Sequence, residues 1–127
     1  MKNKFFMAVS VLIFSISLSN CITTQTYEQG FQSVAGTEWN IMFTDPVIGE
    51  NRNFNIKFMN NGILAHNHPN DITPDNDFWE QNADIIYMYF NDKYSTYIGR
   101  MLSNNLIQGT ATNINGITWN FELRKTR

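Results

Sequence analysis

From Thr37 to the end of the chain, apolar and polar residues alternate, and this pattern limits the fold more than any other feature. The segment TEWNIMF places Trp39, Ile41 and Phe43 on one side of an extended chain, and FNIKF and ITWNFELR repeat the alternation. Successive side chains of a β-strand point to opposite faces, so a period of two is typical of half-buried strands. The sequence therefore predicts an all-β domain, without a helix after residue 37.

Turn signals divide this region into hairpins. Asn-Gly pairs in MNNGI and NINGI lie between apolar runs, and Asn-Gly is the strongest short signal for a hairpin turn. FNDKY and LSNNL are two further turn candidates. Longer loops containing proline are expected at 46–52 and 69–76. We expect strands at 37–45, 53–60, 63–68, 77–81, 84–91, 94–102, 106–113 and 117–125.

A meander of about eight strands leaves two exposed edges unless the sheet closes on itself. We therefore predict an up-and-down antiparallel barrel, or a barrel-like sandwich of the same strands. The turn lengths predict the register. The expected neighbours are Phe58 with Leu64, Met88 with Tyr97, Ala111 with Trp119, and Trp79 with Ile86.

This register predicts which side chains face the interior, and most of them are large. Side chains of this size would largely fill so small a barrel, so we favour a packed core over a ligand pocket. We expect both Trp39 and Trp119 to be buried. The inward set is Trp39, Ile41, Phe43, Phe54, Ile56, Phe58, Leu64, Trp79, Ile86, Met88, Phe90, Tyr97, Met101, Trp119, Phe121 and Leu123.

The layout resembles the lipocalin-like (calycin) barrels over about 90 residues. In that family a Trp in the first strand sits at the closed end of the barrel, and an Arg near the last strand packs across it. Here GTEW places Trp39 one residue later than the family's G-x-W, and Arg124 or Arg127 would correspond to the arginine. The family's C-terminal helix is missing. The resemblance implies a small barrel and, as an alternative function, a carrier of a small apolar ligand.

The run IIYMYF is apolar on both faces, unlike the other strands. With its even-numbered residues inside, the same hairpin directs a tyrosine-rich set outward, which suits a contact surface. Two alternatives stay open: residues 22–36, with Tyr27 and Phe31, cover this set, or the register is shifted by one residue. The candidate binding residues are Ile85, Tyr87, Tyr89, Tyr94 and Ile98.

The run AHNHPND contains both histidines of the chain, His66 and His68, followed by Asp71, Asp75 and Asp77. Two histidines at i and i+2 with a carboxylate can hold zinc. A polar strand end entering a Pro-Asn-Asp turn accounts for the same residues, so we predict no metal and no cofactor, with His66, His68 and Asp71 as weak candidates. Nucleophile and phosphate-binding motifs are missing, so a non-catalytic domain is predicted and a metal-dependent enzyme is a distant third function.

The N-terminus predicts export. MKNK is positively charged, and Phe5 to Leu18 form an uncharged, mostly apolar run that is too short to span a bilayer. These are the n- and h-regions of a secretory signal peptide. We therefore predict a signal peptide at 1–20, which would be removed from the mature protein.

Cys21 is the single cysteine, and an exported chain cannot use it for an internal disulfide. LSNC, residues 18–21, resembles the lipobox of bacterial lipoproteins, with Asn20 where that family usually has Gly, Ala or Ser. The resemblance implies lipidation of Cys21, which would anchor the chain to the cell membrane or outer membrane. Ordinary cleavage after Ser19, giving a secreted or periplasmic protein, is the alternative. We expect residues 21–36 to be a tether and 37–127 the barrel.

After removal of residues 1–20, 11 acidic and seven basic residues remain, giving a net charge of about −4. A basic stripe for nucleic acid is therefore not expected. Taken together, the sequence predicts a bacterial cell-envelope lipoprotein whose barrel is a non-catalytic binding or structural module. Its partner would be another envelope protein, a glycan or a second copy of the chain.

Overall fold

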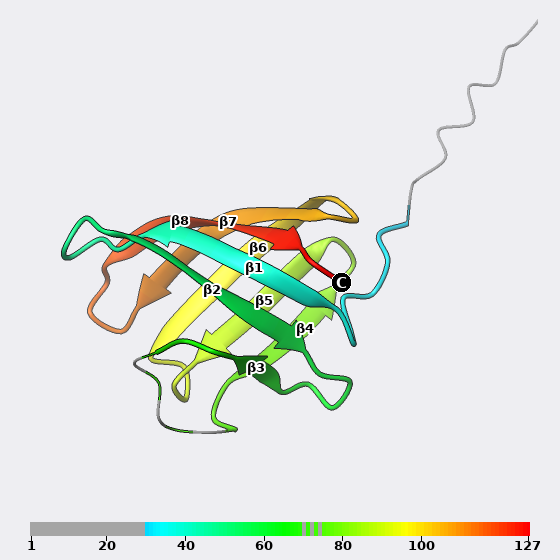
Figure 1. Cartoon of the computed structure of the whole chain (residues 1–127), viewed down its shortest axis with the longest axis horizontal. Coiled ribbons are helices and arrows are strands. Elements are labelled where there is room, and N and C mark those ends of the chain that lie inside the picture. Colours follow the sequence, from blue (N-terminus) through cyan, green and yellow to red (C-terminus); the bar gives the residue numbers. More distant parts are fainter. Residues whose placement is uncertain (1–29, 70, 72, 74) are drawn as a thin grey trace, which may run out of the picture.

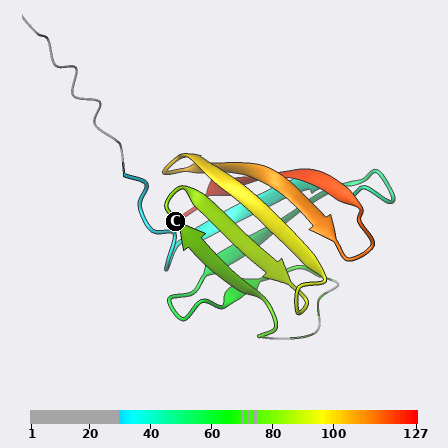
Figure 2. The same cartoon turned by 180° about the vertical axis from the view of Figure 1, so that it is seen from behind.

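The computed structural model describes residues 30–69, 71, 73 and 75–127. They form an eight-stranded antiparallel sheet that curls into a nearly closed barrel (Figures 1 and 2). The predicted all-β meander is confirmed, and no described residue belongs to a helix long and apolar enough to cross a membrane. In spatial order the strands are β3, β2, β1, β8, β7, β6, β5 and β4. Their bounds are Glu38–Thr44 (β1), Asn51–Phe58 (β2), Leu64–His66 (β3), Phe78–Asn82 (β4), Ile85–Phe90 (β5), Ser95–Ser103 (β6), Leu106–Asn113 (β7) and Thr118–Lys125 (β8).

The predicted register holds at all but one hairpin. Trp79 pairs with Met88 instead of Ile86, because the β4–β5 turn begins at Ala83, one residue later than expected. The shift is two residues, so every side chain keeps its predicted face. The confirmed pairs are Phe58–Leu64, Met88–Tyr97 and Ala111–Trp119.

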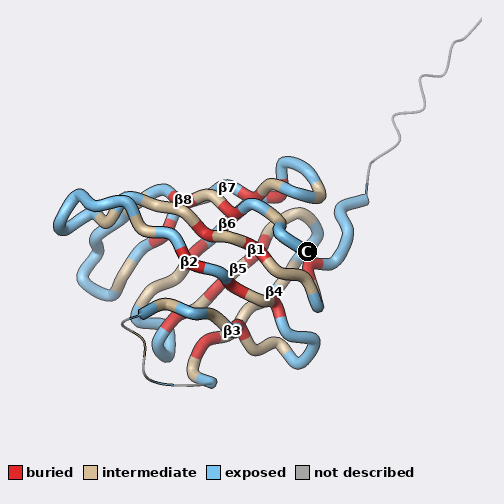
Figure 3. Tube along the Cα trace, in the orientation of Figure 1, coloured by how far each residue is buried: buried red, intermediate tan, exposed pale blue. Residues whose placement is uncertain are grey.

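Buried residues recur along the strands, whereas the loops between strands are mostly exposed (Figure 3). The buried side chains form one core inside the barrel. Every residue predicted to face inward is either buried in this core or packed against its edge. Aromatic rings from opposite walls meet across the interior: ring centroids are 6.3 Å apart for Phe54 on β2 and Phe90 on β5, and 6.3 Å apart for Phe43 on β1 and Tyr97 on β6. Three more hydrophobic residues of the core lie outside the predicted set: Val34, Ile107 and Ala111.

The two tryptophans that were expected to be buried differ. Trp39 is 1 % exposed, and its indole Nε1–H donates to Thr37 Oγ1 at 2.7 Å. Trp119 is only half-buried, so the prediction of full burial is wrong for this residue. Its ring packs against Phe43 and Tyr97 beside the β7–β8 turn, and part of the side chain reaches solvent.

Arg124, one of the two arginines that the family resemblance pointed to, lies on the opposite face of the sheet from Trp39. Arg124 pairs with Asn40 on the outer face of the sheet, and its Nε lies 2.6 Å from Glu122 Oε1. Arg127 is exposed, and its backbone carbonyl accepts a hydrogen bond from the amide of the first residue of β1. The C-terminus therefore meets the start of β1 at one end of the barrel (Figure 1).

The barrel begins earlier in the chain than predicted. Val34 is 1 % exposed, and its N–H donates to Gln81 Oε1 at 2.9 Å. Gln81 Nε2–H in turn donates to the backbone carbonyl of Gln32 at 3.2 Å. One residue of the predicted tether, Val34, is thus part of the core. Cys21, the predicted signal peptide and Tyr27 lie outside the described residues.

Candidate functional site

Strands β3 and β4 are neighbours that scarcely pair. Ile63 and Phe78 form an isolated bridge, beside which Leu64 N–H donates to the carbonyl of Asp77 at 3.0 Å. After β3 the chain leaves in a loop and returns at β4. We call this junction, from Ile63 to Phe78, the β3–β4 seam. Polar side chains from the loop gather at it.

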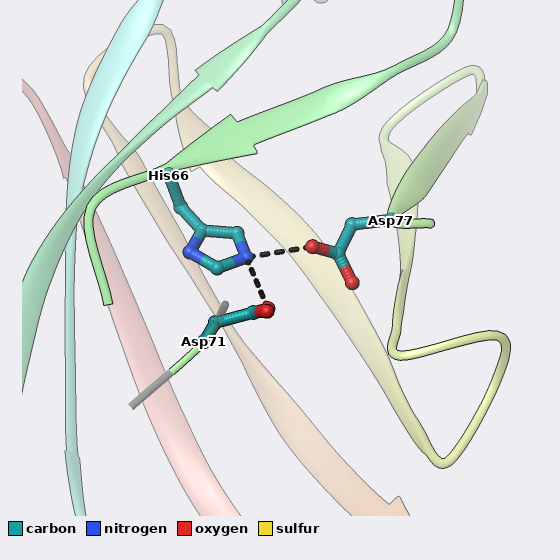
Figure 4. Close-up of side chains that lie close together, drawn as sticks. All are labelled: His66, Asp71 and Asp77. Carbon is teal, nitrogen blue, oxygen red and sulfur yellow. Dashed lines mark hydrogen bonds and ion pairs between the residues drawn. The ribbon is translucent and has the colours of Figure 1, made fainter. Parts of the chain in front are cut away.

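Three of these side chains form a close cluster, hereafter the aspartate–histidine cluster (Figure 4). His66 is the last residue of β3, Asp77 directly precedes β4, and Asp71 comes from the loop between them. His66 Nε2 lies 2.6 Å from Asp77 Oδ2 and 3.2 Å from Asp71 Oδ2. The three side chains are 7 %, 4 % and 9 % exposed for His66, Asp77 and Asp71, so the cluster is largely shielded from water.

The two carboxylates are held from behind by backbone donors. Asn91 N–H, in the β5–β6 turn, donates to Asp77 Oδ1 at 2.6 Å. Thr73 donates to Asp71 Oδ1 twice, from its backbone N–H and from its hydroxyl, each at 2.9 Å. Both Oδ2 atoms are therefore turned toward the imidazole. Because the charged form accepts these bonds, the Thr73 amide holds the pKa of Asp71 below its usual value.

The hydrogen bonds of His66 assign its tautomer. The backbone N–H of His68 donates to His66 Nδ1 at 3.2 Å, so Nδ1 carries a lone pair and the proton resides on Nε2. That single N–H is directed at both Oδ2 atoms. The cluster therefore brings two carboxylate oxygens to one imidazole nitrogen.

No lysine or arginine in the described part of the chain forms an ion pair with the cluster. Among the described residues, Asp71 and Asp77 form ion pairs with His66 alone, and no lysine or arginine pairs with Asp75. A pocket of about 300 Å³ opens beside the cluster, and Thr73 and Asp75 line it together with the three cluster residues. This is an acidic, partly enclosed site with one nitrogen donor.

The sequence prediction covered two of the three cluster members. His66 and Asp71 were weak metal candidates, whereas Asp77 was noted only as a following acid. His68, the other candidate, is not one of the three cluster ligands: its ring lies edge-on against Phe54 with 4.9 Å between centroids, and 6.4 Å from the His66 ring. Burial lowers the pKa of His68 below its usual value. The apolar–polar alternation predicts strands, but it does not indicate which acid of the loop lies close to His66 at the end of β3.

The predicted binding residues form a second candidate site on the outer face of β5 and β6. We call Ile85, Tyr87, Tyr89, Tyr94 and Ile98 the hairpin patch. Tyr94 and Ile98 are 42 % and 49 % exposed, and the other three are half-buried. Tyr87 lies directly opposite Ile98 in the sheet. The N-terminal residues from Gly30 onward reach Gln81 and Asn104 at the end of the barrel.

Phe78 extends the hairpin patch, and the sequence did not predict it. It pairs with Tyr89 on the outer face, with 5.9 Å between ring centroids. Lys93 Nζ lies 5.2 Å from the centroid of the Tyr89 ring, a cation–π contact. Partial burial, with the carboxylate of Glu80 as a smaller cause, raises the pKa of Tyr89 above its usual value. The patch is thus a mixed aromatic and aliphatic surface with a basic edge.

An open groove of about 980 Å³ lies on another part of the barrel. It runs over the outer faces of β2, β1, β8 and β7, where Met42, Asn53, Gln108 and Glu122 form one cross-strand row. The groove is therefore on the outside of the sheet, whereas the centre of the barrel is occupied by the core.

Comparison of the chain with known proteins finds no match to a protein-family model, to a curated protein or to a solved structure. Function is therefore inferred from the residues and their geometry.

Proposed function

We propose that this chain is an exported, lipid-anchored protein of the bacterial cell envelope whose barrel is a non-catalytic binding module. Support for the anchor comes from the sequence: a positively charged start, a short apolar run and then LSNC ending at Cys21. Attachment through two or more acyl chains is stable, so the barrel itself needs no membrane-binding surface.

The observation that carries the binding proposal is the contrast between the interior and the outer face of β5 and β6. Rings from facing walls meet inside, as Phe54 and Phe90 do, which leaves the centre of the barrel to side chains. This argues against the alternative of a lipocalin-like carrier. The hairpin patch instead offers tyrosine and isoleucine side chains to a partner. Contiguous apolar surface of this kind is typical of interaction sites.

The anchor is tested by metabolic labelling with a fatty acid. We expect label to enter the wild-type chain and to be lost in Cys21→Ser, because Cys21 is the only thiol. Cleavage is read from the mature N-terminus by mass spectrometry. An unlipidated mature protein that begins at Asn20 would show that the chain is secreted without an anchor.

The binding surface is tested by replacing Tyr87 and Tyr89 together with serine. Because both side chains lie on the outer face, we expect the barrel to fold with a modest loss of stability. Sedimentation measures self-association, and crosslinking to envelope proteins and a glycan array measure binding of other partners. We expect whichever association the wild type shows to be lost.

A matched control replaces Thr118 and Asn120 with serine, which are exposed outer-face residues of β8. This control should bind as the wild type does. Binding that survives the tyrosine substitutions, or a barrel that unfolds on their introduction, would contradict the assignment of the hairpin patch.

A further inference from the structure

We propose that the aspartate–histidine cluster is a binding site for a divalent transition-metal ion, best suited to Zn²⁺, with His66 Nε2, Asp71 Oδ2 and Asp77 Oδ2 as ligands. This goes beyond the proposed binding module, which uses the opposite, outer surface of the β5–β6 hairpin. The ion would join the end of β3 to the start of β4.

Charge is the first argument. Two carboxylates, each less than a tenth exposed, face a single imidazole. Among the described residues no lysine or arginine pairs with either carboxylate, although buried charges are normally paired or coordinate a metal. Asp75 adds a third acid to the wall of the adjoining pocket. A divalent cation neutralises the two buried carboxylates.

The distances between the ligand atoms also support a metal site. Metal bonds of about 2.0–2.2 Å in a tetrahedral site place the ligand atoms roughly 3.3–3.6 Å apart. His66 Nε2 and Asp71 Oδ2 are 3.2 Å apart, close to this range. On metal binding, the distance of 2.6 Å between His66 Nε2 and Asp77 Oδ2 would have to increase by less than about 1 Å. All three ligand atoms already lie within 4.8 Å of one another.

The donor set indicates which ion fits. Ca²⁺ takes six to eight oxygen ligands and Mg²⁺ prefers oxygen with several waters, whereas an imidazole with two carboxylates suits Zn²⁺. Three protein ligands leave a fourth position, and the pocket of about 300 Å³ gives a water access to it. The ion therefore does not require a fourth side chain.

The groups around the cluster orient the ligands as outer-shell partners do in metal sites. Thr73 fixes Asp71, and the Asn91 amide fixes Asp77. Binding through Nε2 requires the imidazole proton to move from Nε2 to Nδ1 by way of solvent. The hydrogen bond from the His68 N–H to His66 Nδ1, which is 3.2 Å long, must then break.

The test is a titration of the untagged full-length chain with ZnCl₂, followed by calorimetry. A Cys21→Ser background removes the only thiol, which would otherwise bind zinc, and the wild type is titrated alongside. We expect one Zn²⁺ per chain and a rise in the melting temperature that Ca²⁺ at equal concentration does not produce. Asp71→Asn and His66→Gln should each weaken binding by at least about tenfold.

The matched control is Asp75→Asn, which removes the same charge from the same loop and pocket without removing a ligand. Its positive φ of +64° is one that asparagine tolerates. We expect its affinity to stay within about twofold of the parent, since an exposed charge outside the site is largely screened. The melting temperature of each variant without metal shows that it is folded.

Three results would overturn the proposal: no saturable Zn²⁺ binding, equal loss of affinity in Asp75→Asn and Asp71→Asn, or an equal thermal shift with Ca²⁺. None of these measurements involves the hairpin patch or Cys21 lipidation, so a failed metal site and a failed binding module are distinguished.

Discussion

The barrel has two seams between strands that are not joined by a short turn, and they are closed in different ways. At the first, β1 and β8 pair residue by residue from Trp39 opposite Lys125 to Phe43 opposite Phe121. At the second, β3 and β4 share one isolated bridge between Ile63 and Phe78. One seam is continuous sheet, and the other is a short contact between strand ends.

Side chains compensate at the β3–β4 seam. Trp79 Nε1–H donates to the carbonyl of Met59 at 3.0 Å, and its ring packs edge-on against Phe58. Asp77 contacts both His66 and the Asn91 amide, so it connects the end of β3 with the β5–β6 turn. Apolar–polar alternation alone therefore closes the sheet where the strands are long, whereas the short strands need specific polar contacts.

The largest expected effect is at the continuous seam. Ile41 is fully buried and lies opposite Leu123 across β1 and β8. Ile41→Ala should lower the free energy of unfolding by about 2–5 kcal/mol, because it leaves a cavity in a filled core. Urea unfolding followed by tryptophan fluorescence measures the change.

The control for this substitution is Met42→Ala, the neighbouring residue on the outer face of β1, which is half-buried. It removes a side chain of similar size, and we expect a loss of about 1 kcal/mol because less apolar area leaves water on folding. Similar losses for the two variants would show that the two faces of β1 are not distinguished as the structure has them.

The continuous part of the barrel could be predicted because local patterns determine it. Alternation fixes the faces of each strand, and the glycines of the two Asn-Gly turns, Gly62 and Gly116, adopt the positive φ that those turns require. The β4–β5 pairing differs by two residues because Ala83 takes a positive φ of 52°, which its residue type does not suggest. Val34 was missed because a single apolar residue after a polar run has no period.

The aspartate–histidine cluster could be predicted only in part. His66 and Asp71 are conspicuous in AHNHPND, but the loop determines which acid meets the imidazole. For Asp77 the sequence provided only a position, directly before β4, and no sign that its carboxylate would meet His66. Side-chain contacts between a strand end and a loop depend on three-dimensional closure of the seam, which no sequence period encodes.

The smallest expected effect is at the β3–β4 seam, where Trp79→Phe keeps the ring against Phe58 and removes the hydrogen bond to Met59. We expect a loss of about 0.5–1.5 kcal/mol in the free energy of unfolding, the usual contribution of one hydrogen bond. Hydrogen exchange gives the sharper measurement: the Leu64 amide, which bonds to Asp77 across the seam, should exchange faster relative to the Ile41 amide. Trp119→Phe, at a residue with no seam contact, should leave this ratio unchanged. If Trp79→Phe accelerates hydrogen exchange of both amides equally, the β3–β4 seam opens only when the whole barrel unfolds. The two seams would then belong to one cooperative unit.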